Sequence, residues 1–185
     1  MSPRLLAAFL AFFALGARGE GQVVGADYTL HAGDKVEVSV WKEPDLQKVL
    51  IISPDGKLAL PLAGEFAAAG RTVAQVRTEI ENRLKVLITE PVVTVSIQEV
   101  SGNVAYVIGQ VNKPGALVMN PRINVLQALS LTGGGTAFAK LDDIIVIRGA
   151  GSGQHVFPFR YGQVSEGKHL EQNIVLESGD VVIVP

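Results

Sequence analysis

The side chains that most often do chemistry in proteins form no recognisable catalytic or metal-binding pattern in this sequence. The three histidines, His31, His155 and His169, are scattered, and none belongs to an H-x-x-x-H pair that could hold a metal ion. Cysteine is absent, which excludes a thiolate nucleophile, a disulfide and a zinc site built from cysteine. No G-x-S-x-G motif marks a nucleophilic serine. We therefore expect no catalytic, metal-binding or cofactor-binding residue.

Paired carboxylates are the remaining chemistry to consider. A glycosidase needs two carboxyl groups that face each other across a cleft, about 5–10 Å apart. Asp142 and Asp143 are adjacent, which would point their side chains to opposite faces of a strand. More distant residues such as Glu43 and Asp55 could still meet in the fold. A glycan hydrolase or lyase therefore stays open as an alternative, which loss of turnover on substituting these four carboxylates would support.

Two glycine-rich segments raise the question of phosphate binding. Gly133–Gly135 follows a predicted helix and has no Lys-Ser/Thr pair behind it, whereas a phosphate-binding loop precedes its helix. Residues 149–153 (G-A-G-S-G) lack the glycine spacing of a dinucleotide site and lie between two predicted strands. The first segment predicts a helix end and the second a hairpin tip.

The composition limits the classes of partner. The chain has 185 residues, with 16 Lys and Arg against 18 Asp and Glu, and a formal net charge of −2. A nucleic-acid-binding protein needs a basic surface to release counterions, so we expect no nucleic-acid partner. Hydrophobic residues reach 48% and charged residues only 18%, which makes the location of the apolar residues informative.

Part of this apolar excess lies at the N-terminus. An apolar run over residues 5–15 is preceded by Arg4 and followed by mostly small residues at 16–19. This order is typical of a secretory signal peptide, and the run is shorter than the ~20 apolar residues that span a bilayer. We predict a signal peptide at residues 1–19 and a flexible lead-in at 20–27; a retained membrane anchor is the alternative. Export without any cysteine suits the periplasm of a Gram-negative cell.

The rest of the sequence predicts two units, the first at residues 28–100. Thr72 and Gln75 have the spacing of a capping box at the start of one long helix. Residues 42–45 are predicted to interrupt a strand, and Ser53–Gly56 to form the turn of a hairpin. The predicted elements are strands at 35–41, 49–52 and 57–60, a helix at 72–88 and a strand at 92–100.

The second predicted unit spans residues 103–185. Asn124 can cap a short helix that carries apolar residues on one face. The predicted strands are at 104–111, 116–119, 144–147, 155–161 and 181–184. We predict a small β-grasp-like sheet that packs around this helix.

One pattern, L-x-x-G-D-x-V-x-V, occurs at residues 30–38 and again at 176–184. It needs a tight Gly-Asp turn that leads directly into an apolar strand. We predict the same local geometry at both places, without inferring duplicated domains.

Four segments stand out in order along the first unit: G-D-K-V-E-V-S-V-W-K-E-P-D-L (33–46), S-P-D-G-K-L-A-L-P-L-A-G (53–64), R-T-V-A-Q-V-R-T-E-I-E-N-R-L (71–84) and P-V-V-T-V-S-I (91–97). Together they resemble the polysaccharide export (PES) domain of Wza-type outer-membrane polysaccharide exporters. Two later segments, Y-V-I-G-Q-V-N-K-P-G (106–115) and N-V-L-Q-A-L-S-L-T-G-G-G (124–135), are similar to an SLBB domain. The resemblance implies an α+β fold, with a small PES domain at 28–100 followed by a β-grasp-like SLBB domain at 103–185.

This resemblance implies a non-catalytic role in the export of capsular polysaccharide or exopolysaccharide. Wza-type proteins assemble into rings in the periplasm and at the outer membrane, and the polysaccharide leaves through the enclosed cavity. They work with an inner-membrane polysaccharide co-polymerase. The sequence departs from longer exporters in having one SLBB unit, no cysteine for a lipid anchor and no amphipathic helix before Pro185. We therefore expect a homo-oligomeric periplasmic ring that is associated with the outer membrane and meets a separate outer-membrane component.

The resemblance also singles out motif residues, which we expect to set the fold and the contacts between subunits. They are Gly33, Asp34, Trp41, Pro44, Pro54, Asp55, Gly56, Gly109, Val111, Pro114 and Gly115. Trp41 suits a core anchor as well as an interface. A monomeric periplasmic carbohydrate-binding or adaptor module is the alternative function, which saccharide binding to isolated subunits would favour.

Overall fold

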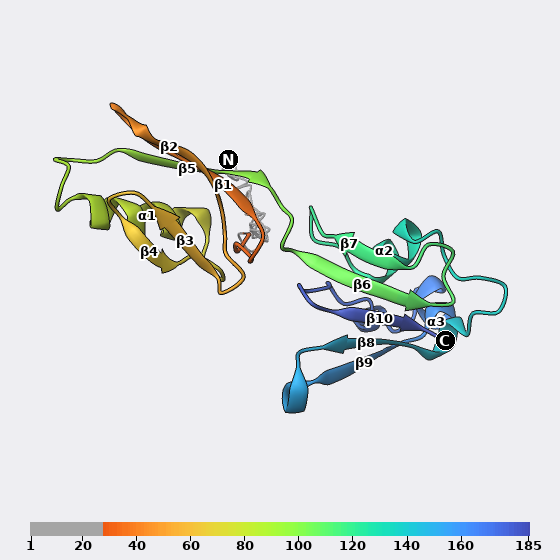
Figure 1. The fold of residues 1–185 in the computed structure, drawn as a ribbon. Helices are drawn as coiled ribbons and strands as arrows, with labels where there is room; N and C mark the ends of the chain where they lie inside the picture. The colour runs from red at the N-terminus through yellow and green to blue at the C-terminus, as the bar shows by residue number, and fades with distance from the viewer. Residues whose placement is uncertain (1–27) are drawn as a thin grey trace, which may run out of the picture.

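The computed structural model describes residues 28–185; the predicted signal peptide and lead-in lie outside the described residues. Figure 1 shows two lobes that are joined by a short connector at residues 100–103. Each lobe contains strands and at least one helix, which confirms the predicted α+β class. Within residues 28–185, no helix is long and apolar enough to cross a membrane.

The first lobe combines a three-stranded sheet, a separate hairpin and one long helix. Its elements are β1 (Lys35–Val40), β2 (Glu43–Ile51), β3 (Lys57–Leu60), β4 (Gly64–Ala67), α1 (Val73–Leu84) and β5 (Val93–Glu99). β1 lies between β2 and β5 and is antiparallel to both, while β3 and β4 form the hairpin. Val36, Val38 and Val40 on β1 are buried in one core with Ile80 and Leu84 on α1. The period-two alternation of the valines therefore sets which face of β1 is covered.

The turn at Ser53–Gly56 forms, but the hairpin that was predicted around it is wrong. Gly56 N donates to Ser53 O at 2.8 Å, and Gly56 has a positive φ of 80°. The turn joins two different sheets, because β2 pairs with β1 and β3 pairs with β4. A turn motif shows where the chain reverses, whereas the choice of strand partner depends on contacts far along the sequence.

The predicted interruption at residues 42–45 forms, but it is shorter and begins one residue earlier. The chain reverses over Trp41 and Lys42 alone; Lys42 has a positive φ of 66°, and Val40 pairs with Glu43 at the start of β2. Pro44 therefore lies inside a strand. Because β2 is at the edge of its sheet, the missing N–H of a proline is tolerated there.

The capping box at the start of α1 is confirmed. Gln75 N donates to Thr72 Oγ1 at 3.3 Å, and Thr72 N donates to Gln75 Oε1 at 2.9 Å. The helix ends at Leu84 rather than at Ile88, and Leu87 is 62% exposed. Val86 and Leu87 are exposed, so they add little packing that would extend the helix beyond Leu84.

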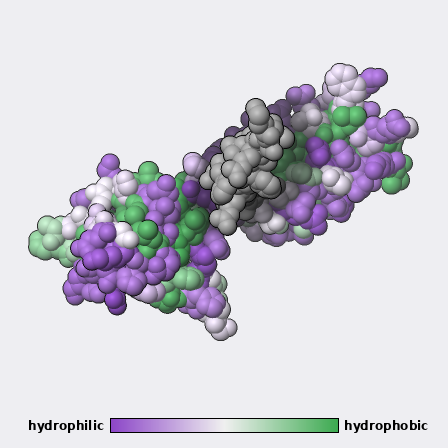
Figure 2. All heavy atoms as spheres, turned by 180° about the vertical axis from the view of Figure 1, so that it is seen from behind, coloured by the Kyte–Doolittle hydropathy of each residue, from purple (hydrophilic) through white to green (hydrophobic). Residues whose placement is uncertain are grey.

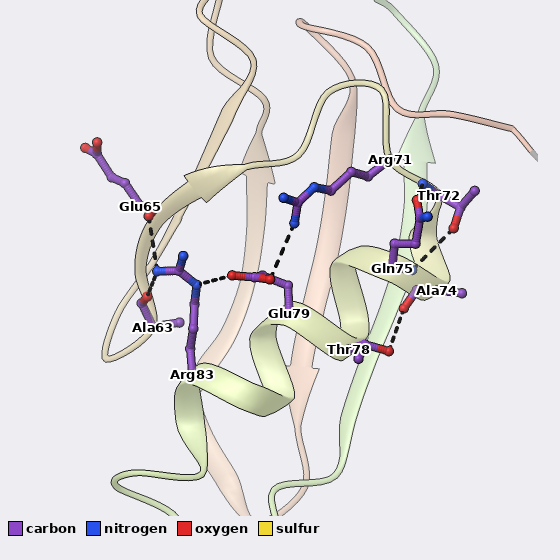
Figure 3. A network of polar contacts seen from close by, with 9 residues as sticks. All are labelled: Ala63, Glu65, Arg71, Thr72, Ala74, Gln75, Thr78, Glu79 and Arg83. Atoms are coloured by element: carbon purple, nitrogen blue, oxygen red, sulfur yellow. Dashed lines mark hydrogen bonds and ion pairs between the residues drawn. The ribbon is translucent and has the colours of Figure 1, made fainter.

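Polar contacts tie α1 to the β3–β4 hairpin (Figure 3). Arg83 Nε donates to Glu79 Oε1 at 2.7 Å. The same guanidinium donates through Nη1 to the carbonyl oxygens of Ala63 and Glu65, at 3.2 and 3.3 Å. It also lies 5.1 Å from the centre of the Phe66 ring. The hydrogen bond from Arg83 holds the pKa of the Glu79 carboxyl below its usual value.

The second lobe is built on a mixed five-stranded sheet in the order β7-β6-β10-β8-β9. Its elements are β6 (Val104–Gly109), β7 (Gly115–Val118), α2 (Val125–Leu131), β8 (Ile144–Arg148), β9 (His155–Phe159), α3 (Tyr161–Ser165) and β10 (Val181–Val184), with 3-10 turns at Leu141–Asp143, Gly151–Gly153 and Leu170–Gln172. β10 is parallel to β6, and the other neighbours are antiparallel. A second core lies between the sheet and α2 and includes Val107, Ala128 and Val182.

Local signals in the second lobe are mostly confirmed. Gln127 N donates to Asn124 Oδ1 at 2.9 Å, so Asn124 caps α2 as predicted. Gly133 has a positive φ of 78° just past the end of α2, and residues 149–153 form the tip between β8 and β9. The helix α3 was not predicted: Tyr161 begins it instead of ending a strand. With five residues, it is too short to show a helical period in the sequence.

Candidate functional site

The described residues assemble no reactive cluster. At residues 28–185, no group of three or more His, Cys, Asp or Glu side chains could hold a metal ion. β2, a strand of nine residues or roughly 30 Å, separates Glu43 from the turn that holds Asp55. Asp142 and Asp143 lie in the other lobe, where Asp142 Oδ1 accepts a hydrogen bond from Gly162 N at 2.7 Å. These four carboxylates do not form the facing pair that a glycosidase needs.

The junction between the lobes is organised around the fully buried carboxylate of Asp34. Its Oδ1 accepts hydrogen bonds from the backbone N–H groups of Ser101 and Gly102 in the connector, at 3.0 and 2.8 Å. Its Oδ2 accepts from His31 N at 2.9 Å and from the Tyr28 hydroxyl at 2.6 Å. Burial, and then the hydrogen bond to Asp34, raises the pKa of the Tyr28 hydroxyl. Four uncharged donors thus satisfy one buried carboxylate and fasten the start of β1 to the connector.

Gly102 is the junction residue that the sequence marks only as part of a turn. A Cβ at this position would lie 2.1 Å from Ala32 O and 2.8 Å from His31 Cβ. Glycine alone lets the connector approach the turn before β1 this closely. From the second lobe, Ser178 Oγ donates to Gly102 O at 2.9 Å. The connector is therefore held from both sides.

The repeated L-x-x-G-D-x-V-x-V pattern has the same local geometry at both places, as predicted. Gly33 and Gly179 have positive φ values of 95° and 90°, and Asp34 and Asp180 are both buried. In each turn the aspartate Oδ2 accepts a hydrogen bond from the N–H three residues earlier, at 2.9 Å for Asp34 and 2.8 Å for Asp180. The apolar residues that follow form β1 and β10.

The two aspartates differ in their remaining partners. Asp180 binds Arg148, whose Nε and Nη2 donate to Oδ1 and Oδ2 at 2.9 and 2.7 Å. Hydrogen bonding to Asp180 raises the pKa of the Arg148 guanidinium, which also pairs with Glu177 at 2.6 Å. The charge of Asp180 is thus neutralised within its own lobe. Asp34 instead uses the corresponding oxygen to hold the connector.

Two open hollows flank the junction. One has a volume of about 630 Å³ and is lined in part by His31, Arg122 and Ser178. The other has a volume of about 540 Å³ and is lined in part by Tyr28, Met119 and Arg122. Residues of both lobes line each hollow. The relative orientation of the lobes, which Asp34 helps to fix, therefore also determines the shape of the hollows.

The remaining motif residues lie on separate turns. Trp41 and Pro44 belong to the β1–β2 hairpin, Pro54, Asp55 and Gly56 to the β2–β3 turn, and Gly109, Val111, Pro114 and Gly115 to the β6–β7 connection. Trp41 is 71% exposed, which excludes the core-anchor interpretation. Asp55 accepts from Ser53 Oγ and pairs with Lys57 at 2.9 Å, and these contacts lower the pKa of its carboxyl.

Gly109 and Val111 have visible roles in the second lobe. Gly109 has a positive φ of 97°, and a Cβ there would lie 2.0 Å from Val184 O on β10. Val111 is buried and forms a bridge with Gly135. Gly109 allows its backbone to lie close to β10, and Val111 packs in the core. Both contributions are structural rather than chemical.

Two known domains match the chain, one along each lobe. Residues 22–98 match the family described as polysaccharide biosynthesis/export protein, and residues 103–184 match the SLBB domain. The chain carries a polysaccharide biosynthesis/export domain followed by an SLBB domain. The family of the first domain is one of non-catalytic polysaccharide export proteins, in agreement with the prediction that the chain is not an enzyme.

Named relatives support the same family. The chain is 29% identical to the exopolysaccharide production protein ExoF of Rhizobium meliloti over 134 residues, which cover 65% of this chain and 31% of ExoF. It is 25% identical to the EPS I polysaccharide export outer membrane protein EpsA of Ralstonia nicotianae over 182 residues, which cover 85% of this chain and 47% of EpsA. It is 27% identical to the capsule polysaccharide export protein BexD of Haemophilus influenzae over 190 residues, which cover 89% of this chain and 44% of BexD. The chain spans less than half the length of each of these relatives.

Proposed function

We propose that this chain is a subunit of a closed ring that exports capsular polysaccharide or exopolysaccharide from a Gram-negative cell. The observation that carries the proposal is the succession of an export domain and an SLBB domain over residues 22–184. The name of EpsA, an outer membrane protein, supports a location at that membrane. The chain itself makes or breaks no bond in the polymer.

The junction supports assembly from identical subunits. In a ring, each subunit repeats the same contacts with its neighbours, so its two lobes must hold one orientation. Asp34 and Ser178 fasten the connector from the two lobes, and Gly102 lets it lie close to the first. A subunit of this kind presents a fixed pair of surfaces to its neighbours.

The location and the partners complete the proposal. Residues 1–19 direct export to the periplasm, and the ring works with an inner-membrane polysaccharide co-polymerase. A separate outer-membrane component continues the path of the polysaccharide. The motif residues on the turns other than Trp41 contribute to the fold and to the contacts between subunits.

Two measurements test this function. Deletion of the gene should remove the polysaccharide from the culture medium, and a plasmid copy should restore it. Native mass spectrometry and cross-linking of the purified chain should give one closed oligomer. Unchanged export after deletion contradicts the proposal, and a strict monomer that binds saccharide favours the carbohydrate-binding or adaptor alternative.

A further inference from the structure

Trp41, the only tryptophan of the chain, is held in a fixed position at the surface. It lies in the two-residue turn between β1 and β2, and its backbone N–H donates to Val92 O at 2.9 Å. Its side chain is 71% exposed. An indole offers a large flat apolar face, and burying it elsewhere in the lobe would have stabilised the fold. The turn between β1 and β2 instead places it at the surface.

A hollow of about 370 Å³ opens beside this indole. Its walls are Ser39, Val40, Trp41, Lys42, Glu43, Pro44, Gln47, Val92 and Thr94. The volume lies within the roughly 300–1,000 Å³ of small-ligand sites. Figure 2 views the molecule from behind and shows apolar and polar residues side by side at the far end of this lobe. The hollow therefore combines an aromatic face with a polar rim.

The polar groups of the rim are suited to hydroxyl groups. Ser39 and Thr94 are cross-strand partners on β1 and β5, and both carry hydroxyls. Gln47 has an amide, which donates to Glu37 Oε1 at 3.3 Å. These groups can donate and accept hydrogen bonds. Lys42 and Glu43 add one charge of each sign, so the rim has no net charge.

A pyranose ring has the matching chemistry. Its hydroxyls lie around the rim of the ring, and its C–H groups form an apolar face that packs against the electron-rich face of an aromatic ring. A shallow, open site holds such a ring weakly, which suits a polymer that must pass on. A lipid surface fits less well, because charged and amide groups surround the indole. The chain also carries a polysaccharide biosynthesis/export domain.

We infer that Trp41 and the hollow beside it form a contact site for a neutral sugar ring of the transported polysaccharide. This inference rests on the proposed function, since it names the substrate contact of the exporter. Trp41 supplies the stacking face, and Ser39, Gln47 and Thr94 supply hydrogen bonds to hydroxyls.

The single tryptophan makes the site directly observable. Fluorescence excited in the indole band reports on Trp41 alone, so the full chain can be titrated with polysaccharide purified from the medium of its own cell. We expect a saturable change in emission and retarded migration of the chain in gels that contain this polysaccharide. Trp41→Ala should weaken retardation by about tenfold or more, and Trp41→Phe should keep part of it, because a phenyl ring still stacks. Phe138→Ala, at an 85% exposed position in the other lobe, is the matched control and should migrate as the wild type does.

Several outcomes overturn the inference. The first is an emission that does not change when the polysaccharide is added, and the second is equal retardation of Trp41→Ala and wild type. The third is an emission change that depends on protein concentration alone. The fourth is an emission change that appears only with phosphatidylethanolamine–phosphatidylglycerol vesicles. The third outcome would assign Trp41 to a contact between copies, and the fourth to a membrane. Circular dichroism of Trp41→Ala checks that the variant is folded. Loss of export after gene deletion with no saccharide contact at Trp41 would retain the proposed function and reject this site.

Discussion

Asp34 and Asp180 show how one local motif serves two different purposes. Both carboxylates are buried, and both close the same turn with the N–H three residues earlier. Asp180 is neutralised by Arg148, whereas Asp34 relies on uncharged donors from Ser101 and Gly102. The two segments share one sequence pattern, so the difference in the partners of the two aspartates comes from the residues that the fold places beside each turn.

We predict that Asp34→Asn destabilises the chain by about 2–4 kcal/mol, because the amide –NH₂ replaces an acceptor that faces backbone donors. Hydrogen exchange should become faster at the amides of Ser101 and Gly102, because the group that accepts from them loses its charge. Urea unfolding and exchange measured by NMR test both effects. Asp180→Asn is the matched variant: it should destabilise the second lobe and leave exchange at the connector slow. Equal exchange in both variants would contradict a special role of Asp34 at the junction.

The raised pKa of Tyr28 predicts a loss of stability in alkali. In the unfolded chain a tyrosine ionises near its ordinary pKa of about 10, while in the folded chain burial and Asp34 keep Tyr28 protonated. The protonated Tyr28 hydroxyl therefore makes its full contribution to the free energy of unfolding below about pH 10. This contribution is lost as the pH rises toward the pKa of Tyr28 in the folded chain. Above about pH 10, the free energy of unfolding should fall more steeply in the wild type than in Tyr28→Phe. Tyr161→Phe, in the other lobe, should follow the wild type; coincident curves for all three proteins would contradict the prediction.

Residue types alone indicated part of this picture. The absence of cysteine and of catalytic motifs pointed to a non-catalytic protein, and the Gly-Asp turns could be read directly. The requirement for glycine at position 102 could not be predicted, because it comes from a close contact with Ala32 O, seventy residues earlier in the chain. The exposure of Trp41 could not be read either, because a tryptophan suits a core and a surface equally.

At the scale of elements, caps were more predictable than pairings. The side-chain caps at Thr72 and Asn124 involve residues three positions apart, and both form as predicted. The predicted partner of β3 is wrong: the chain turns again over residues 61–63, and β3 pairs with β4 beyond this turn, while β2 pairs with β1. Short-range hydrogen bonds follow from local sequence, while strand partners are chosen by the whole core.

The cap of α1 gives a prediction at this scale. Thr72→Ala removes the acceptor for Gln75 N, so we expect a loss of about 1 kcal/mol in the free energy of unfolding. Thr78→Ala on the same helix is the control. Thr78 Oγ1 bonds back to Ala74 O within the helix, so its loss should change stability by less than about 0.5 kcal/mol. Denaturant unfolding of both variants measures the difference, and equal losses would show that the cap contributes nothing special.

At the scale of the whole molecule, residues 28–185 form two hydrophobic cores that are joined at one junction. The first core contains Ile80 and the second contains Ile144, and both side chains are at most 1% exposed. We expect Ile80→Ala and Ile144→Ala each to cost about 2–5 kcal/mol through the cavity that remains. Because the cores are separate, each variant should speed hydrogen exchange mainly in its own lobe. Peptide-resolved exchange by mass spectrometry tests this, and equal acceleration in both lobes would indicate a single cooperative unit.

The sequence by itself determined the α+β class, the helix caps, the two Gly-Asp turns, the lack of catalytic chemistry and the resemblance to polysaccharide exporters. Each of these depends on residue types or on spacings of a few positions. The tertiary structure decided that β3 pairs with β4, that Asp34 holds the connector and that Trp41 stands exposed beside a polar hollow. These features depend on which distant segments share a core, because a buried polar group or an aromatic ring takes its role from the neighbours that the fold brings to it.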